Sequence, residues 1–485
     1  MKLLVCVLFA VIGLLAGCSS GDNGEDIAPN IYPEGEINIS PEVIPGESPT
    51  PAPSTDSEDI VSMFMSTLVA GDMVGAYSFF DDVMRIAGFT RLIELNTFVL
   101  GEFLDFSIGE VHPHGDMLLY EVTITHALGT GVYRVVVDDE GLISGFGTMG
   151  EFVSDLTETF ELPSYTAEAV AVGTDWQLPG ILTLPEGASE QNPVPGVVLV
   201  HGSGPHDMDT NMMGMRVFFD IADFLSENGI AVLRYNKRTF SYDAASIFEA
   251  YGNRFSVRQE TIEDAVLAAE ILRADPRISE VYMLGWSLGG MLAPRIHMQG
   301  GDFDGLILLA ASPRPHLDII IEQIMADMLG AMAIFGETPE ITAVFEQLYG
   351  FAALADSIAF MTEEEALNTQ IVFQPIISAY AYYFLDTLKY PFEEIVANAN
   401  VPILALQGRN DFQILAEVDF IMLQEILGAR ENVQFIMYDN LDHFFMPSIA
   451  QNFREHRDIS LIRPSGTRVD ERVLRDITDW VLRHQ

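Results

Sequence analysis

The segment Gly285–Gly290, with the sequence GWSLGG, constrains the fold of this chain more than any other feature. It follows the apolar run 281–284, which predicts a buried strand, and precedes an apolar stretch that predicts a helix. A serine in that place must occupy a tight, strained turn, where the flanking glycines remove Cβ atoms that would clash. The turn exposes the hydroxyl and places the following N–H groups at a helix N-terminus, where negative charge is stabilised. The segment therefore predicts a nucleophile, Ser287.

Apolar runs alternate with helical patterns through residues 163–485, which predicts one large domain. A hairpin is expected first, over 167–172 and 178–184. Strands that alternate with helices form a mostly parallel sheet with right-handed crossovers, so the predicted fold class is α/β. The later strands are expected at 196–200, 230–235, 281–284, 306–310, 401–407 and 433–438, and the helices at 217–228, 261–274, 416–427 and 470–484.

Two polar residues follow strands of this predicted sheet. Asp411 comes after strand 401–407, and His443 comes after strand 433–438. Because the carboxyl ends of parallel strands meet at one edge of a sheet, both are expected near Ser287. A serine hydroxyl is a poor nucleophile until a base removes its proton, which His443 can do near neutral pH. Asp411 would fix the tautomer of that imidazole, so the three residues predict catalysis through an acyl-serine intermediate.

Other residues compete for two of these roles. Asp439 and Asp442 are alternative acids, although Asp442 directly precedes His443 and the side chains of neighbours rarely face each other. His201 is an alternative base, but its place before Gly202 favours a role in a loop.

The chain order Ser287, Asp411, His443 resembles that of the α/β-hydrolase superfamily, and the resemblance covers about residues 165–485. More narrowly, the chain resembles bacterial serine esterases of the prolyl-oligopeptidase-like and dienelactone-hydrolase-like branch. The resemblance implies an α/β-hydrolase fold, and we expect no cofactor and no metal. Dienelactone hydrolases use Cys where this chain has Ser287, so their reaction is not implied. The narrower resemblance rests on the triad and on segments 201–205, 234–238 and 285–290.

The segment His201–Pro205, with the sequence HGSGP, follows strand 196–200, where such folds place one wall of the oxyanion hole. We expect the backbone N–H groups of Ser203 and Leu288 to be the donors. A phosphate-binding loop is the alternative, but the required Lys-Ser/Thr ending is missing. Asn236 stands where the branch usually has Asp, which would weaken a loop salt bridge there.

An insertion between 312 and 400 is rich in Met, Phe, Tyr and Ile. Segments 316–335 and 371–390 read as apolar helices that either form a cap over Ser287 or pack on the sheet edge. A cap of this composition would offer an apolar, adaptable pocket, which favours ester substrates with apolar acyl or aryl groups. Small peptides or amides are the alternative substrates, because the same triad serves both reactions.

Residues 58–150 predict a small α+β domain of unknown function. Helical spacing around 60–80 precedes strands at 118–127, 132–137 and 142–146. The layout resembles cone-shaped domains that precede hydrolases in some bacterial lipoproteins. His112 and His114 could bind a metal on one strand face, but without a clear third ligand such a pair is usually a surface feature.

The N-terminus predicts a secretion signal over residues 1–17, with an apolar run from Leu3 to Leu15 that is too short to span a bilayer. The four residues Leu-Ala-Gly-Cys that end at Cys18 resemble a bacterial lipobox. The resemblance implies a lipidated Cys18 that anchors the protein to the bacterial cell membrane, outside the cytoplasm. A cleaved signal with a chance Cys is the alternative. Residues 18–57 carry seven prolines and predict an extended tether.

The charge balance excludes one class of partner. Asp and Glu number 71 against 24 Lys and Arg, a net charge of −47 that repels phosphate backbones and argues against nucleic-acid binding. Two cysteines are too few for a disulfide scaffold or a Cys-rich zinc site. We therefore expect a membrane-tethered serine hydrolase that cleaves carboxylic esters. A catalytically idle binding lipoprotein, whose N-terminal domain is the working part, is the alternative of another class.

Overall fold

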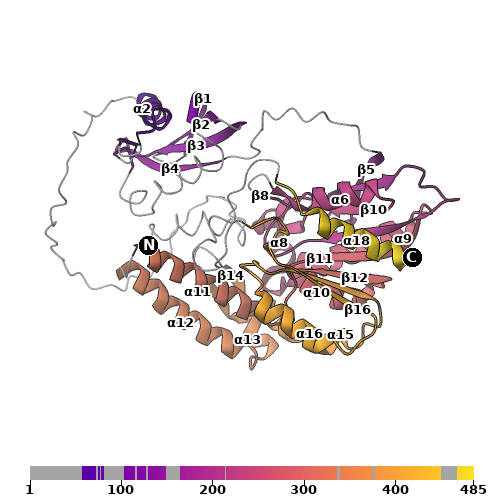
Figure 1. The fold of residues 1–485 in the computed structure, drawn as a ribbon. Coiled ribbons are helices and arrows are strands. Elements are labelled where there is room, and N and C mark those ends of the chain that lie inside the picture. The colour runs from indigo at the N-terminus through magenta and orange to yellow at the C-terminus, as the bar shows by residue number, and fades with distance from the viewer. Residues whose placement is uncertain are drawn as a thin grey trace.

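The computed structural model describes residues 57–484 apart from short gaps, and contains one four-stranded and one eight-stranded sheet (Figure 1). The predicted signal (1–17), its Cys18 and nearly all of the predicted tether (18–57) lie outside the described residues. Of the helices described, none is long and apolar enough to cross a membrane. The gaps are 73–74, 77, 81–102, 115–116, 127–128, 149–163, 213–214, 336–338, 374–376 and 449–466.

The four-stranded sheet belongs to the N-terminal α+β domain, as expected from the sequence. Its strands form an antiparallel meander in the order β1-β2-β3-β4. Helix α2 (Ser57–Val69) places Phe64 and Met65 in one core with Val122 and Val135 of the sheet. The sequence indicated strand β1 only at its end, where His112 and His114 were expected on one strand face. The strands are β1 (Phe103–His114), β2 (Met117–His126), β3 (Gly129–Val137) and β4 (Ile143–Thr148).

The eight-stranded sheet has the order β16-β15-β12-β11-β7-β10-β6-β5. Strands β5 and β6 form the expected antiparallel hairpin, β6 pairs antiparallel with β10, and the remaining pairs are parallel. This confirms the predicted α/β-hydrolase fold class. The bounds are β5 (Tyr165–Val172), β6 (Leu178–Pro185), β7 (Val194–Val200), β10 (Ala231–Tyr235), β11 (Ile278–Trp286), β12 (Gly305–Leu309), β15 (Ile403–Gly408) and β16 (Val433–Tyr438).

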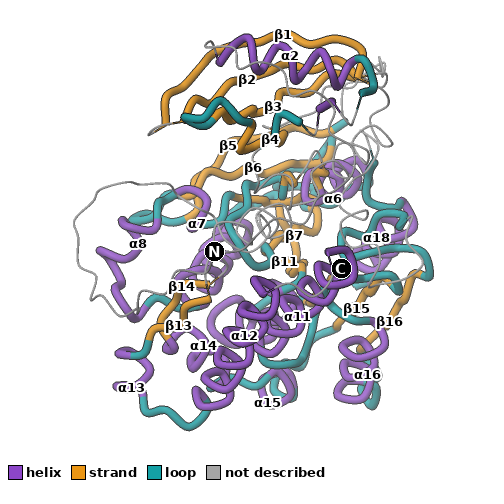
Figure 2. Tube along the Cα trace, turned by 90° about the vertical axis from the view of Figure 1, so that its left-hand side faces the viewer, coloured by secondary structure: helices purple, strands orange, loops and turns teal. Residues whose placement is uncertain are grey.

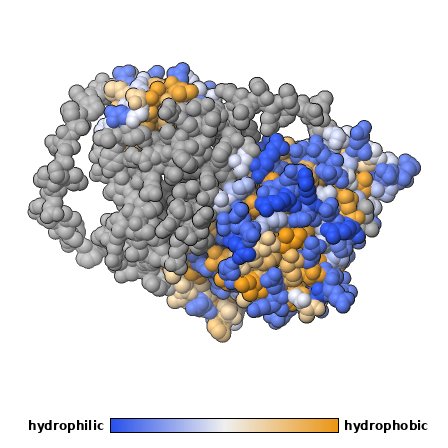
Figure 3. Space-filling view, in the orientation of Figure 1, coloured by the Kyte–Doolittle hydropathy of each residue, from blue (hydrophilic) through white to orange (hydrophobic). Residues whose placement is uncertain are grey.

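Helices cover both faces of this sheet and bury two apolar layers (Figure 1). Helices α6 and α18 contribute to one layer, and α9, α10 and α16 contribute to the other. Hydrophilic residues dominate the coloured face of this unit in Figure 3, with apolar patches between them, which fits the large acidic excess. The bounds are α6 (Val217–Glu227), α9 (Glu263–Ala274), α10 (Leu288–Ile296), α16 (Ile421–Leu427) and α18 (Glu471–Arg483).

A largely helical insertion lies between β12 and β15, as predicted, and its elements are grouped together in Figure 2. Helix α11 has the predicted bounds, but the helix predicted over 371–390 was wrong in its first half. There β13 and β14 form an antiparallel hairpin, and the helix begins only at Ala381. The elements are α11 (His316–Phe335), α12 (Pro339–Ile358), α13 (Glu363–Asn368), β13 (Gln370–Phe373), β14 (Ile377–Tyr380), α14 (Ala381–Leu388) and α15 (Phe392–Val396).

Candidate active site

Ser287 occupies the turn between strand β11 and helix α10. Its backbone has φ 55° and ψ −117°, in the left-handed region that non-glycine residues rarely adopt. The Ser287 N–H donates to the carbonyl of Leu309 on the neighbouring strand at 2.8 Å. The end of the sheet therefore holds the serine in a strained conformation, as the sequence predicted for this turn.

Two glycines make this turn possible because backbone passes directly over them. A Cβ atom on Gly285 would overlap the backbone of Gly289. A Cβ atom on Gly289 would overlap the carbonyl oxygen of Val200 and lie 2.7 Å from that of His201. We call the turn Gly285–Gly290 the elbow. The elbow and the end of β7 are therefore in direct backbone contact, which brings the loop after β7 beside Ser287.

Asp411 and His443 form a buried pair at the same edge of the sheet. Asp411 Oδ2 lies 2.9 Å from His443 Nδ1, and both side chains are almost fully buried. The other oxygen, Oδ1, accepts the backbone N–H groups of Gln413 and Ile414 at 2.8 and 2.9 Å. Gln407 of β15 donates to Oδ2 at 2.9 Å. The carboxylate is thus fixed from several sides, with one oxygen directed at the imidazole.

The alternative acids have other partners. Asp442 Oδ1 accepts the N–H groups of Phe444 and Met446, and so caps the turn in which His443 lies. Asp439 is exposed and pairs with Arg409 at 2.8 Å. Of the three candidate carboxylates, Asp411 is the one that reaches His443.

The loop of His443 lies against the residue that precedes Ser287. Trp286 donates from Nε1 to the carbonyl of His443 at 3.0 Å, and their ring centroids are 5.1 Å apart. Among the described residues, no hydrogen bond joins the Ser287 hydroxyl to His443. Such bonds are often long or poorly aligned in unliganded enzymes and tighten when substrate binds.

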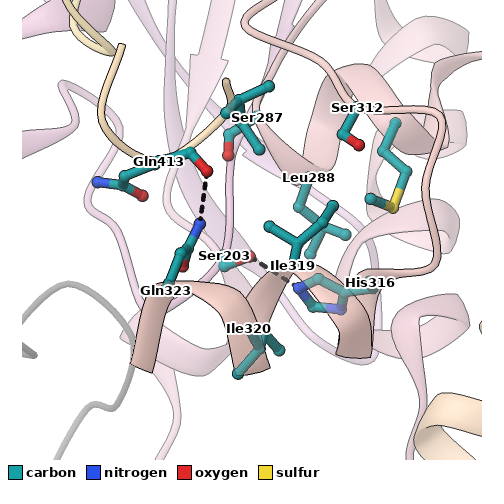
Figure 4. Close-up of a pocket in the computed structure, with 11 residues that line it drawn as sticks. Ser203, Ser287, Leu288, Ser312, His316, Ile319, Ile320, Gln323 and Gln413 are labelled. Carbon is teal, nitrogen blue, oxygen red and sulfur yellow. Dashed lines mark hydrogen bonds between the residues drawn. The ribbon is translucent and has the colours of Figure 1, made fainter. Parts of the chain in front are cut away.

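Ser203 and Leu288 line the same small pocket as Ser287 (Figure 4). Leu288 is the first residue of α10, so its N–H group has no partner within the helix. In the part of the chain that the structure describes, no hydrogen bond is made to the N–H group of Ser203 or of Leu288. Both groups are therefore available to a ligand atom, and their oxyanion role stays a prediction.

Buried histidines hold the loop that carries Ser203. His201 donates from Nε2 to the Tyr235 carbonyl, and His206 donates from Nε2 to the Ser203 carbonyl at 2.7 Å. Burial lowers the pKa of His201 well below its ordinary value and that of His206 to about 4, so both are neutral at neutral pH. His201 thus has the loop role that the sequence favoured. Asn236 accepts the Met208 N–H at 2.8 Å in the same region.

His316 is a site residue that the sequence analysis missed. It is the first residue of α11, and its Nε2 lies 3.1 Å from the hydroxyl oxygen of Ser203 (Figure 4). Burial lowers the pKa of His316 to about 4, with the nearby charge of Lys237 acting in the same direction and that of Glu260 opposing it. No spacing pattern in the sequence links His316 to the elbow, because the contact depends on how the insertion folds back.

The insertion covers Ser287 with apolar side chains. Ile319 and Ile320 of α11 face the pocket opposite Ser287 in Figure 4, together with the amide of Gln323. Among the described residues that line this pocket, none is Asp or Glu. The lining residues are Ser203, Ser287, Leu288, Met291, Ser312, His316, Ile319, Ile320, Gln323, Gln413 and Ile414.

His112, one of the two histidines considered as metal ligands, lies in the N-terminal domain and has acidic neighbours. His112 is half exposed on β1, and its Nε2 lies 3.6 Å from Glu110 and 3.8 Å from Glu121. A search of the described residues finds no group of three or more His, Cys, Asp or Glu that could hold a metal ion.

Comparison with known families agrees with this geometry. The sequence profile of the family described as serine aminopeptidase, S33 matches residues 191–446, which include the elbow and the Asp411–His443 pair. The chain belongs to this family. This member of the serine aminopeptidase S33 family is therefore a serine hydrolase, and not an idle binding protein.

This S33 family member is also similar to individual proteins. It is 30% identical over 406 residues to the esterase EstD of Thermotoga maritima, a match that covers 83% of this chain and 84% of EstD. Among solved structures, Est1E from Butyrivibrio proteoclasticus matches with a TM-score of 0.40 and 15% identity, over 65% of this chain and 98% of Est1E. Dienelactone hydrolase from Anabaena variabilis matches with a TM-score of 0.36 and 13% identity, over 66% and 98% of the two chains.

Proposed function

We propose that the protein hydrolyses carboxylic esters with an apolar acyl or aryl group through an acyl-Ser287 intermediate. The observation that carries the proposal is the Asp411–His443 contact of 2.9 Å at the sheet edge that presents Ser287 on its strained turn. The roles follow from the chemistry of the three groups. Asp411 holds the Nδ1 proton of His443, which leaves Nε2 free to take a proton from Ser287.

The reaction then runs in two halves. Ser287 Oγ attacks the ester carbonyl carbon while His443 takes its proton, and the N–H groups of Ser203 and Leu288 stabilise the negative oxygen that forms. His443 returns the proton to the departing alkoxide, so the alcohol leaves and the acyl group stays on Ser287. Water attacks the acyl-enzyme by the same route and releases the carboxylic acid.

The pocket favours esters over N-terminal aminoacyl substrates. An aminopeptidase must hold the positive α-amino group of its substrate next to the scissile bond, and a carboxylate is the usual partner for such a charge. The described lining of this pocket offers Ile319, Ile320 and Met291 but no carboxylate. The similarity to an esterase over most of both chains supports the same choice.

Activity-based labelling tests the nucleophile. The full-length protein in detergent should react covalently with a fluorophosphonate at Ser287, and the variant Ser287→Ala should not. A folded protein that is not labelled would refute the serine-hydrolase mechanism, whatever its substrate.

A substrate panel tests the ester preference. We expect p-nitrophenyl esters to be cleaved with kcat/KM at least 100-fold above that of aminoacyl p-nitroanilides. The Ser287→Ala variant is the matched control for background hydrolysis. Labelling at Ser287 together with turnover of the anilides alone would instead establish an amidase or peptidase.

The proposal extends to location: a signal over 1–17, a lipid on Cys18, and a tether over 18–57 that holds the enzyme on the outer side of a bacterial cell membrane. The support is the apolar run Leu3–Leu15 and the Leu-Ala-Gly-Cys sequence that ends at Cys18. Cells grown with an alkyne fatty acid should incorporate it into the protein, and the Cys18→Ser variant should lose the label and leave the membrane fraction. Retention of the label in Cys18→Ser would refute the site.

A further inference from the structure

Lys237 is a buried cation beneath the loop that carries Ser203. It follows strand β10, its side chain is 2% exposed, and its Nζ donates to the carbonyl oxygen of Gly202 at 2.7 Å. The same Nζ lies 2.6 Å from Oε1 of Glu260, which is also buried. Lysine is almost never fully buried without a partner, and Glu260 supplies that partner. The ion pair with Glu260 explains how the buried charge of Lys237 is tolerated. It does not explain why the ammonium group also donates to a backbone carbonyl.

The Gly202 carbonyl and the Ser203 N–H belong to one planar peptide group. In a trans peptide these two groups point in opposite directions, so a carbonyl held from beneath by Lys237 turns the N–H to the other side. Ser203 lines the pocket of Ser287, and a Cβ atom on Gly202 would lie 3.1 Å from the Ser287 Cβ. The peptide is therefore placed between the buried ammonium group and the nucleophile.

We propose that Lys237 is a positioning residue that orients and polarises the Gly202–Ser203 peptide, so that the Ser203 N–H becomes a stronger donor to the oxyanion. A cation bound to an amide carbonyl draws electron density from the amide and strengthens hydrogen bonding by its N–H. The gain is greatest when negative charge has formed on the substrate oxygen, so the effect belongs to the transition state. This inference rests on the proposed oxyanion role of Ser203.

The charges around the loop support this role. The imidazoles of His201, His206 and His316 are neutral at neutral pH because burial lowers their pKa values. Burial acts to raise the pKa of Glu260, but the charge and hydrogen bond of Lys237, together with the hydrogen bond from Tyr383, act in the other direction and the pKa is lowered. Glu260 is thus ionised, and Lys237 is the charged side chain that donates to the Gly202 carbonyl of this loop.

The insertion contributes to holding this pair. Tyr383 of α14 donates from its hydroxyl to Oε2 of Glu260, while Oε1 contacts Lys237. Glu260 is therefore fixed between a residue of the cap and the ammonium group. Glu260 lies in a π-helical turn (Arg258–Ile262) before α9, so the orientation of Lys237 depends on three segments distant in sequence.

The test must separate polarisation from mere structural support. Because Lys237→Met alone leaves Glu260 buried and unpaired and can unfold the protein, the test variant is Lys237→Met/Glu260→Gln, which removes both charges together. The matched control is Arg238→Met/Asp264→Asn. That pair is also buried and links the residue after Lys237 to helix α9, but it does not contact the loop of Ser203.

We expect the Lys237/Glu260 double variant of the full-length protein to lose about tenfold or more in kcat on a p-nitrophenyl ester, with KM within about threefold, since one oxyanion donor accounts for about 10² to 10³ in rate. Its affinity for an alkyl boronic acid, which forms an anionic tetrahedral adduct on serine, should fall by a similar factor. The Arg238/Asp264 variant should shift the melting temperature but keep kcat and boronic acid affinity.

Two results would overturn the inference. One is a folded Lys237/Glu260 variant with kcat and boronic acid affinity within twofold of the parent. The other is an equal loss of kcat in the Arg238/Asp264 control, which would show a general structural effect. Either result leaves the proposed function standing if the parent is labelled at Ser287 and cleaves esters, so the two proposals fail separately.

Discussion

Trp286 donates a hydrogen bond from its indole N–H to the backbone carbonyl of His443, although the two residues are 157 positions apart. Trp286 is the last residue of β11, and Ser287 follows it directly. The loop that carries the base is therefore tied to the strand that carries the nucleophile. The position of His443 is thus fixed by the elbow on one side and by Asp411 on the other.

The acid should be identified by a pair of isosteric changes. In Asp411→Asn the amide oxygen can still accept the N–H groups of Gln413 and Ile414, but its NH₂ group would face His443 Nδ1 and favour the wrong tautomer. We expect kcat to fall by about 10³ to 10⁴, and the melting temperature to fall modestly because the new NH₂ group also faces the donor of Gln407. Asp442→Asn is the control and should keep kcat within tenfold. The reverse order of effects would assign the acid to Asp442.

The elbow should not tolerate the single methyl group that a Gly-to-Ala substitution adds at position 289. In Gly289→Ala the new Cβ would overlap the Val200 carbonyl oxygen, so strand β7 and the elbow must separate. We expect the variant to lose fluorophosphonate labelling and to unfold at lower denaturant concentration. Gly350→Ala, on the exposed side of α12 with no atom within 4 Å of the new methyl, should gain up to about 1 kcal/mol of stability and remain active. Full activity in Gly289→Ala would contradict the packing described.

Much of the catalytic edge of the sheet follows from local sequence signals. The strands that end at Trp286, Gly408 and Tyr438 are short apolar runs bounded by turn residues, and parallel strands must present their carboxyl ends together. The sequence therefore predicted that the turn of Ser287, Asp411 and His443 lie at one edge of the sheet, and the Asp411–His443 contact agrees with this prediction.

The residues that surround and hold the catalytic groups could not be predicted from the sequence in the same way. Lys237, Glu260 and His316 are polar residues whose partners come from separate segments, and no periodicity or spacing marks such contacts. The helix predicted over 371–390 failed for a different reason. Its apolar content is compatible with a helix, but the β-branched Ile371 and Val372 and the nearby Pro375 favour a short strand.

The wall of the pocket should set acyl-chain preference. Ile319 of α11 lines the pocket beside Ser287, so Ile319→Ala should raise the ratio of kcat/KM for hexanoate over acetate esters about three- to tenfold. Ile324→Ala is the matched control, since Ile324 is buried in the core of the cap on the same helix and does not line the pocket. Both changes should cost about 2–4 kcal/mol of stability. The same ratio in all three proteins would contradict an acyl site under α11.

A buried carboxyl should make stability fall as pH rises. Asp220 of α6 accepts the N–H of Val469, and burial raises its pKa to about 6 from an ordinary value of 3.8. Between these values the folded protein binds more protons than the unfolded chain, so the free energy of unfolding decreases with increasing pH. Asp220→Asn should lack this loss and gain roughly 1 kcal/mol over the parent between pH 5 and pH 7.5. Denaturant titrations at both pH values measure it, and an equal gap at each pH would count against the buried charge.

The burial of Lys237 has a practical consequence for handling this protein. The chain has three lysines, of which Lys2 lies outside the described residues and Lys237 is enclosed beneath the active-site loop. Lys389, after helix α14, is the remaining one and is 43% exposed. Within the described residues, amine coupling to a dye, a sensor chip or a resin would thus act at Lys389, beside helix α14, and would leave the enclosed ammonium group of Lys237 unmodified.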